Sequence, residues 1–90
     1  MKKRLHVYYS GMVQGVGFRF TLVELARAAG IFGWVKNLPD ARVEVIAEAE
    51  EDELKDFLEK IHGQFASHIR DADVVWLAAA DEFSDFNVRY

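Results

Sequence analysis

The chain contains no cysteine, which excludes disulfide bonds and metal sites built on thiolates. No apolar run approaches the roughly 20 residues that a membrane-spanning helix needs. The N-terminal segment, residues 1–10, is basic but lacks the apolar block and the small-residue cleavage site of a signal peptide. These absences favour a soluble protein that works in the cytoplasm without depending on an oxidising compartment.

Apolar residues are abundant enough to build one packed core. The 90 residues are 51% hydrophobic and 13% aromatic, which is typical of a folded domain and argues against disorder. At this length, and without a linker, an internal repeat or a low-complexity tract, we expect a single domain over residues 1–90.

Charge is unevenly distributed along the chain. Residues 1–37 carry six lysines and arginines against one acidic residue, a net charge of +5, whereas residues 38–90 carry five against fourteen, a net charge of −9. An overall net charge of −4 argues against a general nucleic-acid surface. The positive first part suits a small anionic ligand, and most of the later carboxylates are expected to be solvated.

Hydrophobic periodicity predicts the order of the secondary structure. Strand patterns occur over residues 5–10, 31–37, 43–48, 72–80 and 86–90. Helical spacing predicts one helix over residues 22–29, ended by Gly30, and a second over residues 50–61, ended by Gly63. The proline and aspartate of LPDA, residues 38–41, predict the turn of a hairpin.

This βαββαβ order with a short C-terminal strand is that of an α+β, ferredoxin-like sandwich. In that fold two helices cover one face of an antiparallel sheet. The same order serves RNA-recognition domains, whose sheet aromatics stack on bases, and Tyr8 is a candidate platform residue. The RNP1 pattern is absent and the acidic balance opposes that reading, but the fold alone does not decide the function.

The most unusual stretch is SGMVQGVGFRF, residues 10–20, between the first strand and the first helix. Glycines permit positive φ and let backbone N–H groups converge, and a helix start adds further unpaired N–H groups. The guanidinium of Arg19 adds a planar fork of donors that matches phosphate oxygens. The stretch therefore predicts a seat for a phosphate-like anion. The alternative is a glycine-rich turn whose arginine simply faces solvent.

Other candidate sites are weaker. No dinucleotide-binding, Walker or G-x-S-x-G signature occurs. The acidic run over residues 48–60 lacks the loop spacing of oxygen ligands and is expected to be a helix with a solvated face. His6, His62 and His68 have no metal-binding spacing and are expected to be surface or hydrogen-bonded residues. We therefore expect no metal site.

Two motifs resemble those of the acylphosphatase family. The segment Gly11–Arg19, GMVQGVGFR, matches the family signature G-x-V-Q-G-V-x-F-R at every fixed position. The segment Gly33–Asn37, GWVKN, matches the second signature, G-W/F/Y-V-K/R-N, which a turn and a strand follow. The closing FNVRY, residues 86–90, resembles the terminal strand of the family. The resemblance covers essentially the whole chain, including the element order.

The resemblance implies hydrolysis of the carboxyl–phosphate bond of small acyl phosphates, without metal or cofactor, to a carboxylate and inorganic phosphate. It implies that Arg19 binds the substrate phosphate and that Asn37 orients the attacking water. The backbone cradle for the phosphate would come from Gln14, Gly15, Val16, Gly17 and Phe18. We expect the protein to be a monomer, without a nucleic-acid or membrane partner. We also expect the reaction product, inorganic phosphate, to inhibit it.

Two alanines depart from the family pattern. Ala41 and Ala49 stand where the family usually has glycine. An alanine held at positive φ costs about 1 kcal/mol, and a reshaped hairpin would displace Asn37. Asparagine before Leu-Pro-Asp is, besides, a common turn former. These points support an alternative function, a non-catalytic ferredoxin-like regulatory module that binds phosphate or another anion.

Overall fold

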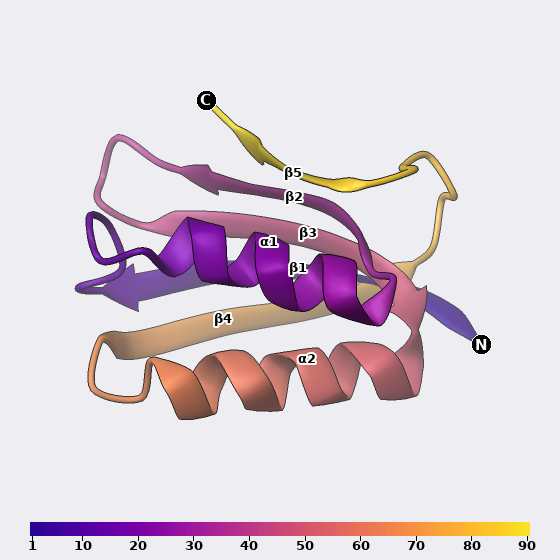
Figure 1. The fold of residues 1–90 in the computed structure, drawn as a ribbon, viewed down its shortest axis with the longest axis horizontal. Helices are drawn as coiled ribbons and strands as arrows, with labels where there is room; N and C mark the ends of the chain where they lie inside the picture. The colour runs from indigo at the N-terminus through magenta and orange to yellow at the C-terminus, as the bar shows by residue number, and fades with distance from the viewer.

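The computed structural model describes residues 1–90, with elements in the order β1-α1-β2-β3-α2-β4-β5 (Figure 1). The strands are β1 (Lys2–Gly11), β2 (Phe32–Asn37), β3 (Val43–Glu50), β4 (Ile69–Ala78) and β5 (Phe86–Arg89). The helices are α1 (Phe18–Ala29) and α2 (Glu51–Gln64). The predicted ferredoxin-like α+β fold is confirmed. Neither helix is long and apolar enough to cross a membrane.

The five strands form one sheet in the order β4-β1-β3-β2-β5. β1 pairs antiparallel with β3 and β4, and β3 pairs antiparallel with β2. β5 runs parallel to β2, so the sheet is mixed rather than antiparallel throughout. The reason is the direction of the chain: β4 points opposite to β1, and one further reversal aligns β5 with β1 and β2. β4 begins at Ile69 rather than Ala72 because its pairing with β1 continues to Gly11.

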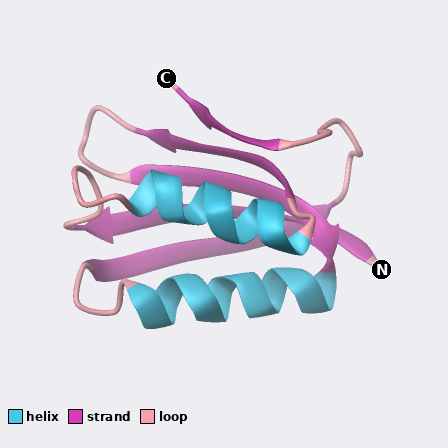
Figure 2. Cartoon of the chain, viewed as in Figure 1, coloured by secondary structure: helices cyan, strands magenta, loops and turns pink.

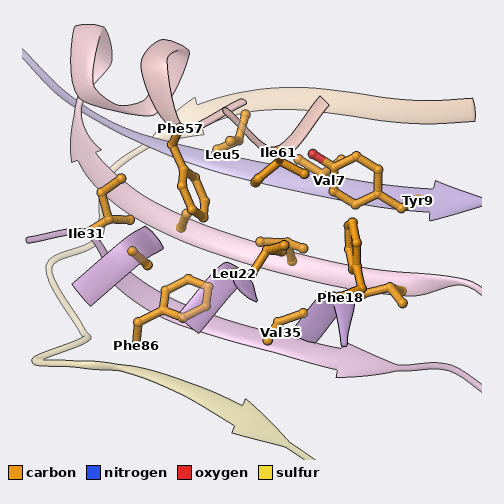
Figure 3. Close-up of a cluster of buried hydrophobic side chains, with 14 of the residues drawn as sticks. Leu5, Val7, Tyr9, Phe18, Leu22, Ile31, Val35, Phe57, Ile61 and Phe86 are labelled. Atoms are coloured by element: carbon orange, nitrogen blue, oxygen red, sulfur yellow. The ribbon is translucent and has the colours of Figure 1, made fainter. Parts of the chain in front are cut away.

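Both helices cover the same face of the sheet (Figure 2). Alternate residues of each strand point toward the helices, and the core lies between the two layers. Burial of each large apolar side chain contributes about 1.5–3 kcal/mol. The labelled core residues are Leu5, Val7, Tyr9, Phe18, Leu22, Ile31, Val35, Phe57, Ile61 and Phe86 (Figure 3).

The two helices end differently. α1 ends at Gly30, which is left-handed with a φ of 70°, as predicted. Gly63 does not end α2, and that prediction was wrong: the helix continues to Gln64. The buried ring of Phe65 stands 4.8 Å from the ring of Phe18, centroid to centroid. We attribute the later end of α2 to this packing, which outweighs the weak helix propensity of glycine.

The segment between β4 and β5, residues 79–85, is fixed to the sheet by Glu48. This side chain is 5% exposed and lies on the face that the helices leave open. Its carboxylate accepts hydrogen bonds from the Ala80 and Asp81 N–H groups at 2.8 and 3.0 Å, and from Arg4 Nε at 2.8 Å. Burial acts to raise the pKa of Glu48, but these donors hold it below its ordinary value.

Candidate active site

Three turns meet at one end of the sheet, on the left of Figure 1. They are the β1–α1 loop (residues 12–17), the β2–β3 turn (residues 38–42) and the α2–β4 connection. Arg19 lies in the first turn of α1, and Asn37 is the last residue of β2. Both predicted catalytic residues therefore come from elements whose ends meet at this side of the molecule.

The β1–α1 loop depends on glycine at two positions. Gly15 and Gly17 have φ values of 75° and 79°, in the left-handed region that side chains disfavour. No atom lies within 4 Å of the point where a Cβ would stand on either residue. Backbone angle, rather than crowding, is therefore what requires glycine here. Both glycines thus adopt the positive φ that the sequence analysis expected them to permit.

The start of α1 has no cap from its own chain. Gly17 supplies no side-chain hydrogen bond, and the first turn contains no acidic residue. The first hydrogen bond of the helix runs from Thr21 N–H to Gly17 O, at 3.1 Å. The N–H groups before Thr21, including those of Phe18 and Arg19, are thus left for an external acceptor. Together with the positive end of the helix dipole, they favour an anion.

Arg19 lies beside these backbone amides. A hollow of about 260 Å³ is lined by Val13, Gly15, Gly17, Phe18, Arg19 and Phe20. The guanidinium carbon of Arg19 stands 5.6 Å from the centre of the Tyr90 ring. None of the salt bridges in the structure involves Arg19. Its charge is therefore available to a ligand in the hollow.

A larger hollow, of about 650 Å³, opens beside the β2–β3 turn and the start of β4. Its lining includes Arg42, His68 and Arg70 but neither Arg19 nor Asn37. The Arg42 guanidinium is already bonded to Asp40, with Nε and Oδ2 2.8 Å apart. Arg70 also forms no salt bridge, so we place the candidate site in the smaller hollow because only there does an arginine lie beside the uncapped start of α1.

Asn37 does not line the smaller hollow; it lies at the end of β2, at the same end of the sheet as the start of α1. Alternate residues of a strand share a face, so Asn37 follows buried Val35 onto the face that α1 covers. Its Oδ1 atom is buried and accepts no hydrogen bond within the protein. A buried acceptor without a partner costs about 1–3 kcal/mol, and such groups are often kept for a functional reason. The oxygen keeps a free acceptor site, but the surrounding atoms cover it in this structure and must move before a water molecule can reach it.

Gln14 connects the loop to the turn that follows Asn37, a role that sequence reasoning missed. Its Nε2 donates hydrogen bonds to the carbonyl oxygens of Leu38 and Arg42, both at 2.9 Å. The motif match gave Gln14 only a backbone role in the cradle. Its partners are backbone atoms, which any residue carries, so no sequence signal identified them.

The two alanines that depart from the family pattern differ in conformation. Ala41 has a φ of 73°, so it adopts the left-handed conformation that favours glycine. Ala49 lies in β3 opposite Lys3 and is not among the residues with positive φ. The strain expected from sequence is therefore present at Ala41 and absent at Ala49.

The other sequence candidates have partners within the protein. The Tyr8 hydroxyl donates to Glu44 Oε2 at 3.1 Å, and the Arg42 guanidinium carbon stands 4.7 Å from the centre of the Tyr8 ring. One side of this ring is thus occupied by a guanidinium. The three histidines are hydrogen-bonded, as expected: His6 to Glu44, His62 to Tyr9 and His68 to Ser67.

Known proteins match nearly the whole chain. The family model described as Acylphosphatase matches residues 5–88. An acylphosphatase of Marinobacter nauticus is 41% identical over 88 residues, covering 97% of this chain and 96% of that protein. One of Lactobacillus gasseri is 39% identical over 90 residues, covering 98% and 99%. The crystal structure of acylphosphatase from Bacillus subtilis matches with a TM-score of 0.90 and 33% identity, covering 98% and 99%. The chain belongs to the acylphosphatase family.

Proposed function

We propose that this protein hydrolyses small acyl phosphates to a carboxylate and inorganic phosphate. Arg19 and the backbone amides from Gln14 to Phe18 hold the phosphoryl group, and Asn37 orients the attacking water. The observation that carries the proposal is the uncapped start of α1 with the unpaired guanidinium of Arg19 beside it. Membership of the acylphosphatase family supports the reaction class.

Phosphate binding follows from the donors in the hollow. The phosphoryl oxygens accept hydrogen bonds from loop and helix N–H groups, while the guanidinium offers two parallel donors to two oxygens. These donors are fixed by the fold before substrate arrives. They therefore stabilise charge on the phosphoryl oxygens as the transition state forms, without reorganisation.

The role of Asn37 is to position water rather than to remove its proton. A carboxamide does not accept a proton at neutral pH, but its Oδ1 accepts a hydrogen bond from water and its amide donates one. The water oxygen forms a bond to phosphorus, and the bond between phosphorus and the carboxyl oxygen breaks. The carboxylate leaves with that bonding electron pair, and the proton of the water passes to a phosphoryl oxygen or to bulk solvent.

This chemistry suits a site without a strong base. An acyl phosphate is a mixed anhydride, and its carboxylate is a good leaving group that needs no protonation. Most of the catalysis in phosphoryl transfer comes from positioning and electrostatic stabilisation. The residue types at the site, one arginine, one asparagine and backbone amides, supply those two effects.

A non-catalytic anion-binding module is the second candidate, and the strained Ala41 favours it. The two functions share the phosphate seat and differ in whether Asn37 is held where water can attack. A misplacement of about 1 Å can lower a rate on the order of a hundredfold. The module would therefore bind phosphate normally and show no turnover.

The test is hydrolysis of benzoyl phosphate by the purified protein in the presence of EDTA. We expect a rate above that of buffer, saturation with substrate and competitive inhibition by inorganic phosphate. The Arg19→Ala variant serves as the preparation control, because a contaminating phosphatase would retain its activity in that sample. Phosphate binding without hydrolysis would support the module instead.

A cytoplasmic location and a monomeric state are parts of the same proposal. We also propose that the substrate is a small molecule rather than a nucleic acid. Cell fractionation tests the location, and sedimentation at micromolar protein concentration tests the monomer.

A further inference from the structure

We propose that the side chain of Gln14 is a positioning residue that fixes the place of Asn37 relative to the phosphate cradle. This inference rests on the proposed function, because it concerns how the two parts of that site are held together. In it, the carboxamide of Gln14 does not bind substrate. It acts across the gap between the β1–α1 loop and the β2–β3 turn.

The Gln14 amide uses both of its hydrogens on the turn. The acceptors, Leu38 O and Arg42 O, each lie 2.9 Å from Nε2. Both carbonyls already accept a hydrogen bond that closes the turn: Leu38 N–H to Arg42 O at 2.8 Å, and Ala41 N–H to Leu38 O at 3.2 Å. Gln14 therefore binds the same two oxygens on which the turn closes.

Asn37 directly precedes this turn. It faces Val43 in the β2–β3 register, and Leu38, the next residue, is one of the two Gln14 acceptors. Since Asn37 Oδ1 has no hydrogen-bond partner, no such bond fixes that oxygen. Its location follows from the backbone at the end of β2. A contact that fixes Leu38 therefore also fixes Asn37.

The turn needs an external restraint because one of its residues is strained. Ala41 has a φ of 73°, a conformation that is unfavourable for alanine. The observed turn is therefore disfavoured relative to turn conformations in which Ala41 has a negative φ. The two hydrogen bonds from Gln14 oppose such a rearrangement. Gln14 also precedes Gly15, the first left-handed residue of the cradle, so one residue links both parts of the site.

The principal variant is Gln14→Met, which keeps an unbranched side chain of similar length and removes both donors. Gln64→Met, at the exposed end of α2, is the matched control. Benzoyl phosphate is the substrate, and inorganic phosphate is the competitive inhibitor. We expect kcat to fall about tenfold to a hundredfold, as for a misplacement of up to about 1 Å, and the inhibition constant of phosphate to change less than twofold.

A double-variant cycle separates positioning from an independent contribution. In the Asn37→Ala background, adding Gln14→Met is expected to lower kcat no further, because the group that Gln14 positions is already absent. An equal additional loss in that background would overturn the proposal. So would a large rise in the phosphate inhibition constant with kcat unchanged, since Gln14 would then belong to the cradle.

Two further measurements keep the inference testable if activity or folding fails. Amide hydrogen exchange at Leu38 and Ala41 is expected to be faster in Gln14→Met, with exchange at Val45 in β3 unchanged. This readout needs no turnover, so the failure of the proposed function is distinguishable from failure of the link. If Gln14→Met does not fold, Gln14→Asn keeps the amide but is one methylene too short to span both oxygens. Unchanged hydrogen exchange at the Leu38 and Ala41 amides in the Gln14 variant would contradict the proposal.

Discussion

The guanidinium carbon of Arg19 stands 5.6 Å from the centre of the Tyr90 ring, and that residue is 93% exposed. The ring lies close to the cation without neutralising it. A cation–π contact at such an exposed place contributes about 0.5–1 kcal/mol. The charge of Arg19 therefore stays available for a ligand, with the Tyr90 ring as a neighbour.

The first prediction concerns that charge. Arg19→Ala is expected to lower kcat/KM for benzoyl phosphate by at least about a hundredfold, because two hydrogen bonds to a charged group contribute about 1.5–3 kcal/mol each. The affinity for inorganic phosphate, measured by calorimetry, is expected to fall as well. Arg19→Lys is also expected to fail substantially, because a single ammonium lacks the planar fork.

Arg70→Ala is the control for these variants, because Arg70 lines the larger hollow and not the smaller one. It is expected to behave like the unaltered protein. Full activity of Arg19→Ala, or loss of phosphate binding in Arg70→Ala alone, would show that phosphate binds in the larger hollow instead.

The second prediction separates chemistry from binding. Asn37→Ala is expected to lower kcat about tenfold or more while inorganic phosphate still inhibits competitively. Its free energy of unfolding is expected not to fall, because the substitution removes a buried acceptor that has no partner. Steady-state kinetics and urea denaturation check the two halves. Loss of phosphate inhibition would instead make Asn37 part of the seat.

The third prediction uses the two alanines as a matched pair. Ala41→Gly is expected to stabilise the protein by up to about 1 kcal/mol, because Ala41 has a φ of 73°. It is expected to raise turnover if the strained hairpin holds Asn37 away from its best position. Ala49 lies in β3 and does not have a positive φ. Ala49→Gly is therefore expected to destabilise the protein by about 0.5–1 kcal/mol. The same change in stability for both alanines would contradict this reading of the strain.

The fourth prediction concerns Glu48. Glu48→Gln keeps the shape but loses the charge that three donors share, so we expect a loss of about 1–3 kcal/mol in the free energy of unfolding. Turnover of the folded fraction is expected to be unchanged, since Glu48 lies toward the end of β3 away from the turn. Denaturation at pH 7 and kinetics at low temperature check both. A large fall in kcat without loss of stability would show that this segment influences the site.

The fifth prediction is a pH dependence of stability. Burial lowers the pKa of His62, whose Nε2 lies 2.9 Å from the Tyr9 hydroxyl, below its ordinary value of 6.5. Below pH 6.5 the unfolded chain binds a proton that the folded protein takes up only at lower pH. Stability from this group is therefore complete above pH 6.5 and is lost as the pH falls. Thermal denaturation from pH 7.5 to 5 is expected to show this slope, and His62→Gln to flatten it. An identical slope in both proteins would assign it to other groups.

Local features of the fold were predictable where a residue type has few alternatives. The left-handed backbone at Gly15, Gly17 and Gly30 could be predicted from sequence, because glycine tolerates that conformation best. The prediction that Gly63 ends α2 was wrong because glycine is also tolerated inside a helix. Here Phe65, two residues later, is buried and packs well.

Long-range partners were not predictable in this way. Glu48 has the sequence context of an outward-facing strand residue, but Arg4 and the backbone of Ala80 and Asp81 bond to its carboxylate in the folded protein. Gln14 bonds to carbonyl groups, which leave no mark on the sequence. The contacts that link the β1–α1 loop to the β2–β3 turn could therefore be found only in the three-dimensional structure.

The carboxylate contacts of Glu48 have a practical consequence for engineering. The segment that they fasten, residues 79–85, lies on the right of Figure 1, and the glycine loop and the hairpin turn lie on the left. A peptide epitope inserted after Phe83 would follow the Ala80 and Asp81 contacts in the chain, and it would project from the end of the molecule opposite the β1–α1 loop. The scaffold thus offers an insertion point for tags or immobilisation handles at the end of the molecule away from the candidate site.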